Sequence, residues 1–203
     1  DETVATVHVA DGVYMARSEA DIFTANVVGA IRLVGTNTSS RGAVIDGQKK
    51  RRPLNVNNPR ALVANIACDN GYLVAYTAGL SGGVWLYDGV VSNCLVARCT
   101  GISAGGLTQY GGLFTDSVVT NCLNTTHTGG DRYGGGASVF GGTLQRTTVT
   151  KCQNGRGGGI YVNGASAVVR DCRIVDNFSV LGGNVRLNQG LVERCLIADN
   201  RQG

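Results

Sequence analysis

The stretch Ala104-Gly-Gly-Leu-Thr-Gln-Tyr-Gly-Gly-Leu-Phe-Thr-Asp-Ser-Val-Val-Thr-Asn-Cys122 decides the fold, because the chain repeats it. The second copy is Gly134-Gly-Gly-Ala-Ser-Val-Phe-Gly-Gly-Thr-Leu-Gln-Arg-Thr-Thr-Val-Thr-Lys-Cys152, and shorter copies run over 82–94, 157–172 and 182–195. Each copy opens with a Gly-Gly pair and an apolar run, passes a turn and closes on Val-x-x-Cys. Such repeats predict a solenoid in which each unit is one stacked coil.

The spacing and composition of the repeats predict strands rather than helices. From Ile66, which closes a degenerate first copy, to Cys195, the equivalent positions recur at unequal intervals; the longest lies before Cys152 and the shortest after it. Helical solenoids keep a nearly constant unit length, and no long segment here has a clear helical period. Short β-rich runs separated by variable Gly, Asn, Asp and Ser turns indicate coils whose strands stack while their loops vary.

Three stretches carry a resemblance to a known fold. Gly157–Val162 followed by 168–177, the opening Val7–Tyr14, and Ala43–Gly47 resemble the repeats of right-handed parallel β-helix proteins. Within that pectate-lyase-like fold, the pattern is most similar to bacterial surface and polymorphic outer-membrane-protein-type repeats. The resemblance covers essentially all of 1–203 and specifies the fold but no activity. We therefore predict one all-β domain, a single-stranded right-handed parallel β-helix (solenoid) of about eight coils.

The seven cysteines fit the interior of such a coil. Equivalent side chains of successive coils lie above one another, and cysteine behaves as a small buried hydrophobe. We predict one inward-facing column, a structural ladder formed by Cys94, Cys122, Cys152, Cys172 and Cys195. The expected state is free thiols, with one or two disulfide bridges as the alternative. No Cys-x-x-Cys motif is present, so no catalytic or metal-binding cysteine is predicted.

The overall composition points away from several classes of protein. Charged residues make up 16% of the chain and the net charge is only +4, which favours neither disorder nor nucleic-acid binding. No apolar run is long enough for a membrane span. Gly is abundant, at 31 of 203 residues, but it does not recur at every third position as in collagen.

The best candidates for ligand binding are acidic residues near arginines in the last coils. The resemblance to pectate-lyase-like enzymes implies carboxylates that hold calcium and a basic residue that abstracts a proton. This chain has no Asp-Asp pair and no lysine near these positions, so no catalytic or metal-ligating residue is assigned. The alternative is that Asp-Asn pairs such as Asp176-Asn177 are turn residues. The candidate set is Asp171, Arg173, Asp176, Arg194 and Asp199.

Other polar and aromatic side chains have ordinary explanations beside functional ones. His8 is expected to point outward from the first strand, and His127 to lie in a loop. The charge run 49–52 is a solvated loop or a site for an acidic glycan. The exposed aromatic rings of Trp85, Tyr87, Tyr110 and Tyr133 could stack on sugars. Trp85 and Tyr161 occupy equivalent strand positions, so the alternative is a simple surface stack.

Taken together, these features predict a secreted or surface-displayed protein with a structural or adhesive role. No capping element is evident at either end, which predicts either a piece of a longer protein or ends that meet head to tail in a fibre. The expected partners are other copies, through the end coils, and a glycan or another cell-surface molecule. The alternative function is a polysaccharide lyase or epimerase acting on an acidic glycan, with calcium as its only foreseeable cofactor.

Overall fold

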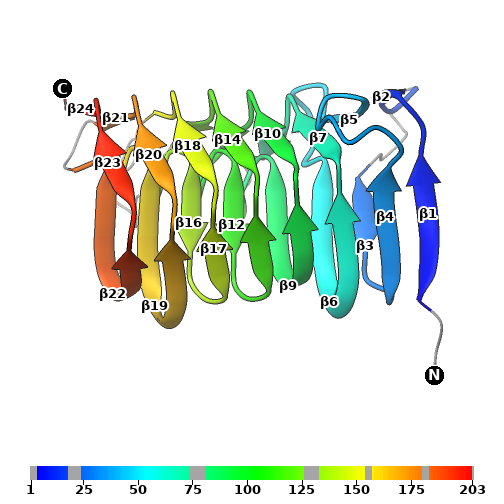
Figure 1. Ribbon diagram of the computed structural model, residues 1–203. Helices are drawn as coiled ribbons and strands as arrows, with labels where there is room; N and C mark the ends of the chain where they lie inside the picture. Colours follow the sequence, from blue (N-terminus) through cyan, green and yellow to red (C-terminus); the bar gives the residue numbers. More distant parts are fainter. Residues whose placement is uncertain are drawn as a thin grey trace.

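The protein is a rod of parallel strands stacked coil upon coil (Figure 1). The computed structural model describes residues 4–17, 24–73, 81–125, 133–153, 157–179 and 183–202, and these contain strands but no helix. The rod begins with β1 (Ala5–Val9) and ends with β22 (Val185–Glu193) and the two short strands that follow it (Figure 1). The predicted all-β parallel solenoid is confirmed.

Each coil contributes strands to three faces of the rod. The largest sheet has eleven strands, and its longer members bend through a turn, so that each runs along one side of the rod and returns along another (Figure 1). Besides β1 and β22, it contains β3 (Ala25–Val27), β4 (Ile31–Gly35), β6 (Leu54–Ala64), β9 (Val84–Ser92), β12 (Leu107–Gln109), β13 (Leu113–Thr115), β16 (Ala137–Val139), β17 (Thr143–Gln145) and β19 (Ile160–Arg170).

The second face is an eight-stranded sheet, and the third face consists of two short sheets. The eight strands are β2 (Gly12–Tyr14), β5 (Ala43–Asp46), β7 (Ile66–Asp69), β10 (Leu95–Ala97), β14 (Val118–Thr120), β18 (Thr148–Thr150), β20 (Arg173–Val175) and β23 (Leu196–Ala198). The short sheets are formed by β8 (Tyr72–Leu73), β11 (Thr100–Gly101) and β15 (Leu123–Asn124), and by β21 (Phe178–Ser179) and β24 (Arg201–Gln202).

Two corners of each regular coil depend on one residue in the left-handed conformation. These residues have φ between 44° and 60°, a region that costs a non-glycine residue about 1–2 kcal/mol. The first corner joins the eleven-stranded to the eight-stranded sheet, and the second joins the eight-stranded sheet to the third face. The first-corner residues are Asn65, Asn93, Asp116, Arg146, Asp171 and Arg194; the second-corner residues are Asn70, Arg98, Asn121, Lys151, Asp176 and Asp199.

These corners define about six regular turns, fewer than the eight coils predicted. The difference arises at the N-terminal end, where the layers containing β1 to β5 stack on the rod without the paired left-handed corners. Equivalent positions on the eight-stranded sheet are unequally spaced along the chain, because the loops between the third face and the next coil vary in length. These positions are Cys68, Val96, Val119, Val149, Ile174 and Ile197.

The cysteines form two columns, which corrects the single ladder predicted from the repeats. Cys94, Cys172 and Cys195 follow the first corner, where Ile66, Ser117 and Thr147 occupy the same position in the other coils. Cys122 and Cys152 follow the second corner and stack with Cys99 instead. The Val-x-x-Cys motif occurs at both corners, so the sequence match joined residues from different corners. Cys68 belongs to neither column, because it lies inside strand β7.

In most coils the residue after the corner makes the same hydrogen bond. Its side chain donates a hydrogen bond to the carbonyl two residues earlier, at 3.2 Å for Cys94, 2.6 Å for Ser117 and 2.8 Å for Thr147. Asn177 does the same at 3.1 Å in the second-corner column. The position therefore favours a small side chain with a donor, and cysteine is one of four residue types that make this bond here; Ile66 and Gly71, which follow the two corners of the first regular coil, are exceptions.

The thiols are free and shielded by the coils. Six of the seven cysteines are buried, and only Cys195 in the last coil is partly exposed. Burial raises the pKa of the Cys94 and Cys172 thiols to about 12, so these groups stay protonated at neutral pH. The glycine pairs of the repeat permit this packing. A Cβ on Gly106 would lie 2.5 Å from Val119 Cγ1 and 3.1 Å from Cys122 Sγ.

We expect the free energy of unfolding of Cys94→Ser to lie within about 1 kcal/mol of the wild-type value. Cys94→Val should lower the free energy of unfolding by roughly 1–3 kcal/mol. Serine can keep the hydrogen bond to the Ser92 carbonyl, as Ser117 does in the next coil, whereas valine cannot donate and overfills the column. Urea unfolding followed by circular dichroism measures both changes. Equal losses in the two variants would show that the donor is irrelevant.

Candidate functional site

The predicted acidic and basic candidates are divided between the two edges of the eight-stranded sheet. Asp171 and Arg194 are first-corner residues, whereas Asp176 and Asp199 are second-corner residues. The three residues of β20 separate Asp171 from Asp176, a distance of roughly 10 Å or more along an extended strand. Arg173 lies on β20 between them, with an exposed side chain. The set therefore does not converge on one point.

Asp171 and Asp176 each bind an arginine from the next coil. Arg194 donates from Nε and Nη2 to the two carboxylate oxygens of Asp171, at 2.7 and 3.0 Å. Arg201 Nη2 lies 3.1 Å from Asp176 Oδ1. The guanidinium of Arg194 holds the pKa of Asp171 below its usual value. The turn interpretation of these residues is confirmed for Asp176 and Asp199, which occupy equivalent corners, while Asp69 precedes its corner by one residue.

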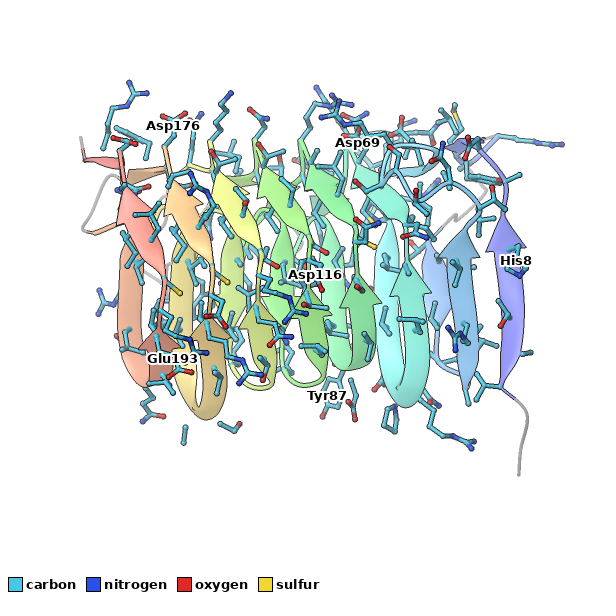
Figure 2. All side chains as sticks on the ribbon, in the orientation of Figure 1. His8, Asp69, Tyr87, Asp116, Asp176 and Glu193 are labelled. Atoms are coloured by element: carbon cyan, nitrogen blue, oxygen red, sulfur yellow. The ribbon has the colours of Figure 1, made fainter. Side chains whose placement is uncertain are left out.

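The same arrangement recurs one turn earlier on the first corner. Arg146 donates from Nε and Nη2 to Asp116, at 2.7 and 2.9 Å. Asp116, Arg146, Asp171 and Arg194 therefore alternate in charge along one edge of the rod (Figure 2 labels Asp116). An alternating row of this kind compensates its own charges and leaves little field to attract an ionic ligand.

The aromatic residues contact one another in one cluster, in which Tyr87 and Tyr110 are exposed and Tyr161 is buried. Tyr110 and Phe140 have ring centroids 5.1 Å apart and planes within 19°, and Tyr87 lies 5.9 Å from Tyr110. Tyr133 and Tyr161 extend the cluster, with centroids 5.2 Å apart. The register confirms that Trp85 and Tyr161 occupy equivalent strand positions, with two coils between them. Only Tyr110 and Phe140 lie face to face, whereas the other neighbouring rings contact each other tilted or edge-on.

The basic residues of the charge run 49–52 differ in their exposure to solvent. Lys49 and Lys50 are exposed, as expected for a solvated loop, but Arg52 is buried beside Trp85, with its guanidinium carbon 5.7 Å from the ring centroid. Arg52 Nε donates to the Ser81 carbonyl at 2.9 Å, and burial lowers its pKa to about 10. His8 is exposed on β1, as predicted, and His127 lies outside the described residues.

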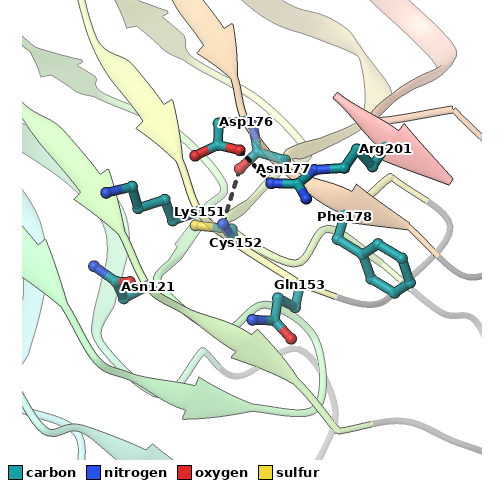
Figure 3. A pocket seen from close by; sticks show the side chains of 8 residues that line it. All are labelled: Asn121, Lys151, Cys152, Gln153, Asp176, Asn177, Phe178 and Arg201. Carbon is teal, nitrogen blue, oxygen red and sulfur yellow. Dashed lines mark hydrogen bonds and ion pairs between the residues drawn. The ribbon is translucent and has the colours of Figure 1, made fainter. Parts of the chain in front are cut away.

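A pocket of about 610 Å³ lies along the second corner, where it meets the third face (Figure 3). Its volume falls in the range of small-molecule sites. Three consecutive corner residues form one side of it, and β21 and β24 form the other. The lining residues are Asn121, Lys151, Cys152, Gln153, Asp176, Asn177, Phe178 and Arg201.

The floor of the pocket is rigid and its hydrogen bonds are satisfied. Asn177 is 1% exposed, and its Oδ1 accepts from the Cys152 backbone N–H at 3.0 Å (Figure 3). Its Nδ2 donates to the carbonyls of Val149 and Val175, at 2.9 and 3.1 Å. Its backbone N–H donates to Asn200 Oδ1 in the following coil, at 2.9 Å. These bonds tie three coils together beneath the pocket, so Asn177 and Cys152 are structural.

The rim carries the groups that are available to a ligand. The left-handed corner turns the exposed Lys151 side chain outward, and within the described residues its ammonium has no ion-pair partner. Asn121 and Gln153 supply exposed amides, and the half-buried Phe178 supplies a ring face. Beside the paired Asp176 and Arg201, a cation without an ion-pair partner among the described residues, two amides and one aromatic ring suit an anionic ligand with hydroxyl groups.

Sequence reasoning placed only Asp176 of these residues in a candidate site. Asn121, Lys151 and Arg201 come from separate coils, and the pocket exists only because coil stacking aligns them. The sequence signal that could have indicated the pocket was the position of Lys151 directly before a cysteine of the repeat. It was missed because the two corners were not separated.

Scans against protein-family models, curated proteins and solved structures find no match to this chain. Across the described ranges, no helix is long and apolar enough to cross a bilayer. The same ranges hold no group of three or more His, Cys, Asp and Glu side chains placed to bind a metal ion. The functional argument therefore depends on this chain's own geometry.

We expect Arg194→Gln to raise the pKa of Asp171 toward the ordinary value of 3.8, because the two guanidinium hydrogen bonds that favour the carboxylate are lost. In the wild type, a depressed pKa contributes stability above pH 3.8 that is lost as the pH falls through the folded-state value. NMR titration of the aspartate carboxyl resonances measures the shift. An unchanged Asp171 titration would show that the ion pair does not form in solution.

Proposed function

We propose that this protein is an extracellular or cell-surface β-solenoid with a structural and adhesive role, and that its side pocket binds an acidic saccharide. The pocket at the second corner carries the proposal, since it combines an ammonium that has no ion-pair partner in the described ranges, two amides and an aromatic ring on a rigid floor. The likeness of the repeats to bacterial surface repeats supports the location. Binding is proposed to require no cofactor.

The chemistry of the pocket favours an acidic saccharide over a simple inorganic anion. The Lys151 ammonium can pair with a carboxylate, and the Asn121 and Gln153 amides can exchange hydrogen bonds with hydroxyl groups. Phe178 offers an apolar surface that a phosphate or sulfate ion would not use but the face of a sugar ring would. Further saccharide units could follow the corner row along the rod.

The lyase or epimerase alternative has weaker support from the geometry. Proton abstraction next to a uronate carboxyl group needs a base held free near its working pH. Asp171 and Asp176 are committed to arginines, and they lie on opposite edges of the eight-stranded sheet. Binding without turnover is therefore the better supported role for this surface.

Lys151→Asn should weaken binding of a tri-uronic oligosaccharide about tenfold or more, the scale of one charge-assisted hydrogen bond. Asparagine is a suitable replacement because Asn121 occupies the same corner one coil earlier. The matched control is Lys49→Asn, which removes one charge from another exposed residue with φ near 53° and should leave affinity unchanged. Isothermal titration calorimetry with EDTA present measures both.

Two results would contradict the proposed binding. One is equal affinity for the neutral, methyl-esterified oligosaccharide, and the other is an equal loss in the Lys49→Asn control. The same titrations, followed by ultraviolet absorbance, test the alternative. An unsaturated uronate product, formed when the proton is removed and the glycosidic oxygen leaves, would establish a lyase instead.

A further inference from the structure

A second pocket, of about 340 Å³, lies on the outer face of the eight-stranded sheet. Its floor is formed by outward side chains of successive coils, and the pocket is deepest where these side chains are small. Ala67 on β7 lies between the larger Val44 and Leu95 of the neighbouring strands. Ala67 and Ala97 are 3% and 6% exposed, so they form a sunken apolar floor.

The segment 36–42, which joins β4 to β5, supplies the wall on the first-corner side. Asn93, a first-corner residue, donates from Nδ2 to the Thr38 carbonyl at 2.7 Å and so fastens this segment to a later coil. Arg41 belongs to the segment and lines the pocket with an exposed side chain. In the parts of the chain that the structure describes, the Arg41 guanidinium has no ion-pair partner.

The opposite wall belongs to the second corner and contains Arg98 and Asn121. Arg98 forms an ion pair with Asp69, whose side chain is only 14% exposed, whereas the Arg98 side chain is 62% exposed. The charges of this pair cancel, so Arg41 gives the pocket a net positive charge. Asp69 lines this pocket and Asp176 lines the larger one, and Figure 2 shows both along the same edge of the rod.

The two pockets meet at Asn121, which lines both of them. Asn121 is exposed, and Figure 3 shows it at the end of the larger pocket that lies away from Arg201. Arg98, Asn121 and Lys151 occupy the second corner of three successive coils. The Asn121 amide therefore lies between two cations that are two coil spacings, or roughly 10 Å, apart. A ligand that follows the corner passes from one pocket into the other.

We propose that the two pockets are consecutive subsites for one acidic saccharide chain, which runs from Lys151 over Asn121 to a further acidic unit at Arg41. This inference rests on the proposed function and specifies its ligand as a chain with acid groups in both pockets. Arg41 can form charge-assisted hydrogen bonds with a carboxylate, and the floor at Ala97 can receive the apolar face of a sugar ring. A trimer in the larger pocket leaves Arg41 without a ligand, whereas a hexamer reaches it.

Isothermal titration calorimetry with EDTA present compares the tri-uronic oligosaccharide with its hexamer. The hexamer should bind the wild type about tenfold or more tightly than the trimer, because units in both pockets are joined in one chain. That gain exceeds the roughly fourfold increase expected when three consecutive units of a hexamer can occupy a single pocket in four positions.

Arg41→Gln should lower the hexamer affinity about tenfold and leave the trimer affinity unchanged, because Arg41 lines only the second pocket. The matched control is Arg32→Gln, which removes the same charge from an exposed arginine of β4 and should change neither affinity.

Ala97→Val tests the floor of the second pocket without changing its charge. The added methyl groups should lower the hexamer affinity several-fold, because they occupy the space that the sugar ring needs. Val175 holds the same place in this outward column on β20, so the sheet accepts valine there. Circular dichroism checks that the fold is retained.

Lys151→Asn separates this inference from the proposed function, since it should weaken binding of both oligosaccharides. If Lys151→Asn changes neither affinity, the proposed function fails. If it weakens the trimer as expected, three results would overturn the second subsite alone. These are a hexamer gain of no more than roughly fourfold, an unchanged hexamer affinity in Arg41→Gln or Ala97→Val, and an equal loss of trimer and hexamer affinity in Arg41→Gln.

Discussion

The structure depends on the in-register stacking of its left-handed corners. One residue at each corner adopts φ near 50°, and its backbone N–H bonds to the next coil, as Asn93 does with the Thr115 carbonyl at 3.2 Å. The left-handed conformation costs an isolated non-glycine residue free energy. Because every regular coil repeats it at the same two positions, it determines where the chain turns. Since every regular coil bends at the same two places, the strands between the corners must lie over one another, and so must the side chains.

Stacking also determines what the polar residues can do. A side chain at a corner projects outward next to the equivalent side chain of the coils before and after it. Where the row alternates in sign, as from Asp116 to Arg194, the charges pair among themselves and stabilise the rod. Where the row contains Asn121, Lys151 and Asp176, one cation is left without an ion-pair partner among the described residues, and a pocket forms beside it. The left-handed corner thus produces a row of paired charges at the first corner and a candidate binding site at the second.

Stacking of the coils also determines which side chains fill the interior. In most coils the position after the corner holds cysteine, serine, threonine or asparagine, and Cys94, Ser117, Thr147 and Asn177 each donate to the carbonyl two residues back. The cysteines that follow the corners are therefore members of one hydrogen-bonding set, and all of them except Cys195 are buried. The large interior side chains, such as Phe114 and Leu144, come from the strands instead.

The sequence by itself determined the repeat, the parallel stacking, the all-β class and the burial of the cysteines, because these follow from local patterns that every coil repeats. It also predicted the outward position of His8 and the equivalence of Trp85 with Tyr161. Only the tertiary structure separated the two corners, since the same Val-x-x-Cys motif satisfies the same local requirement at both. That separation decided which cysteines stack, which carboxylates are neutralised by Arg194 and Arg201, and why the Lys151 ammonium stands beside Phe178 at the pocket. Contacts between coils join distant positions across loops of unequal length, so their partners depend on the register of the whole rod.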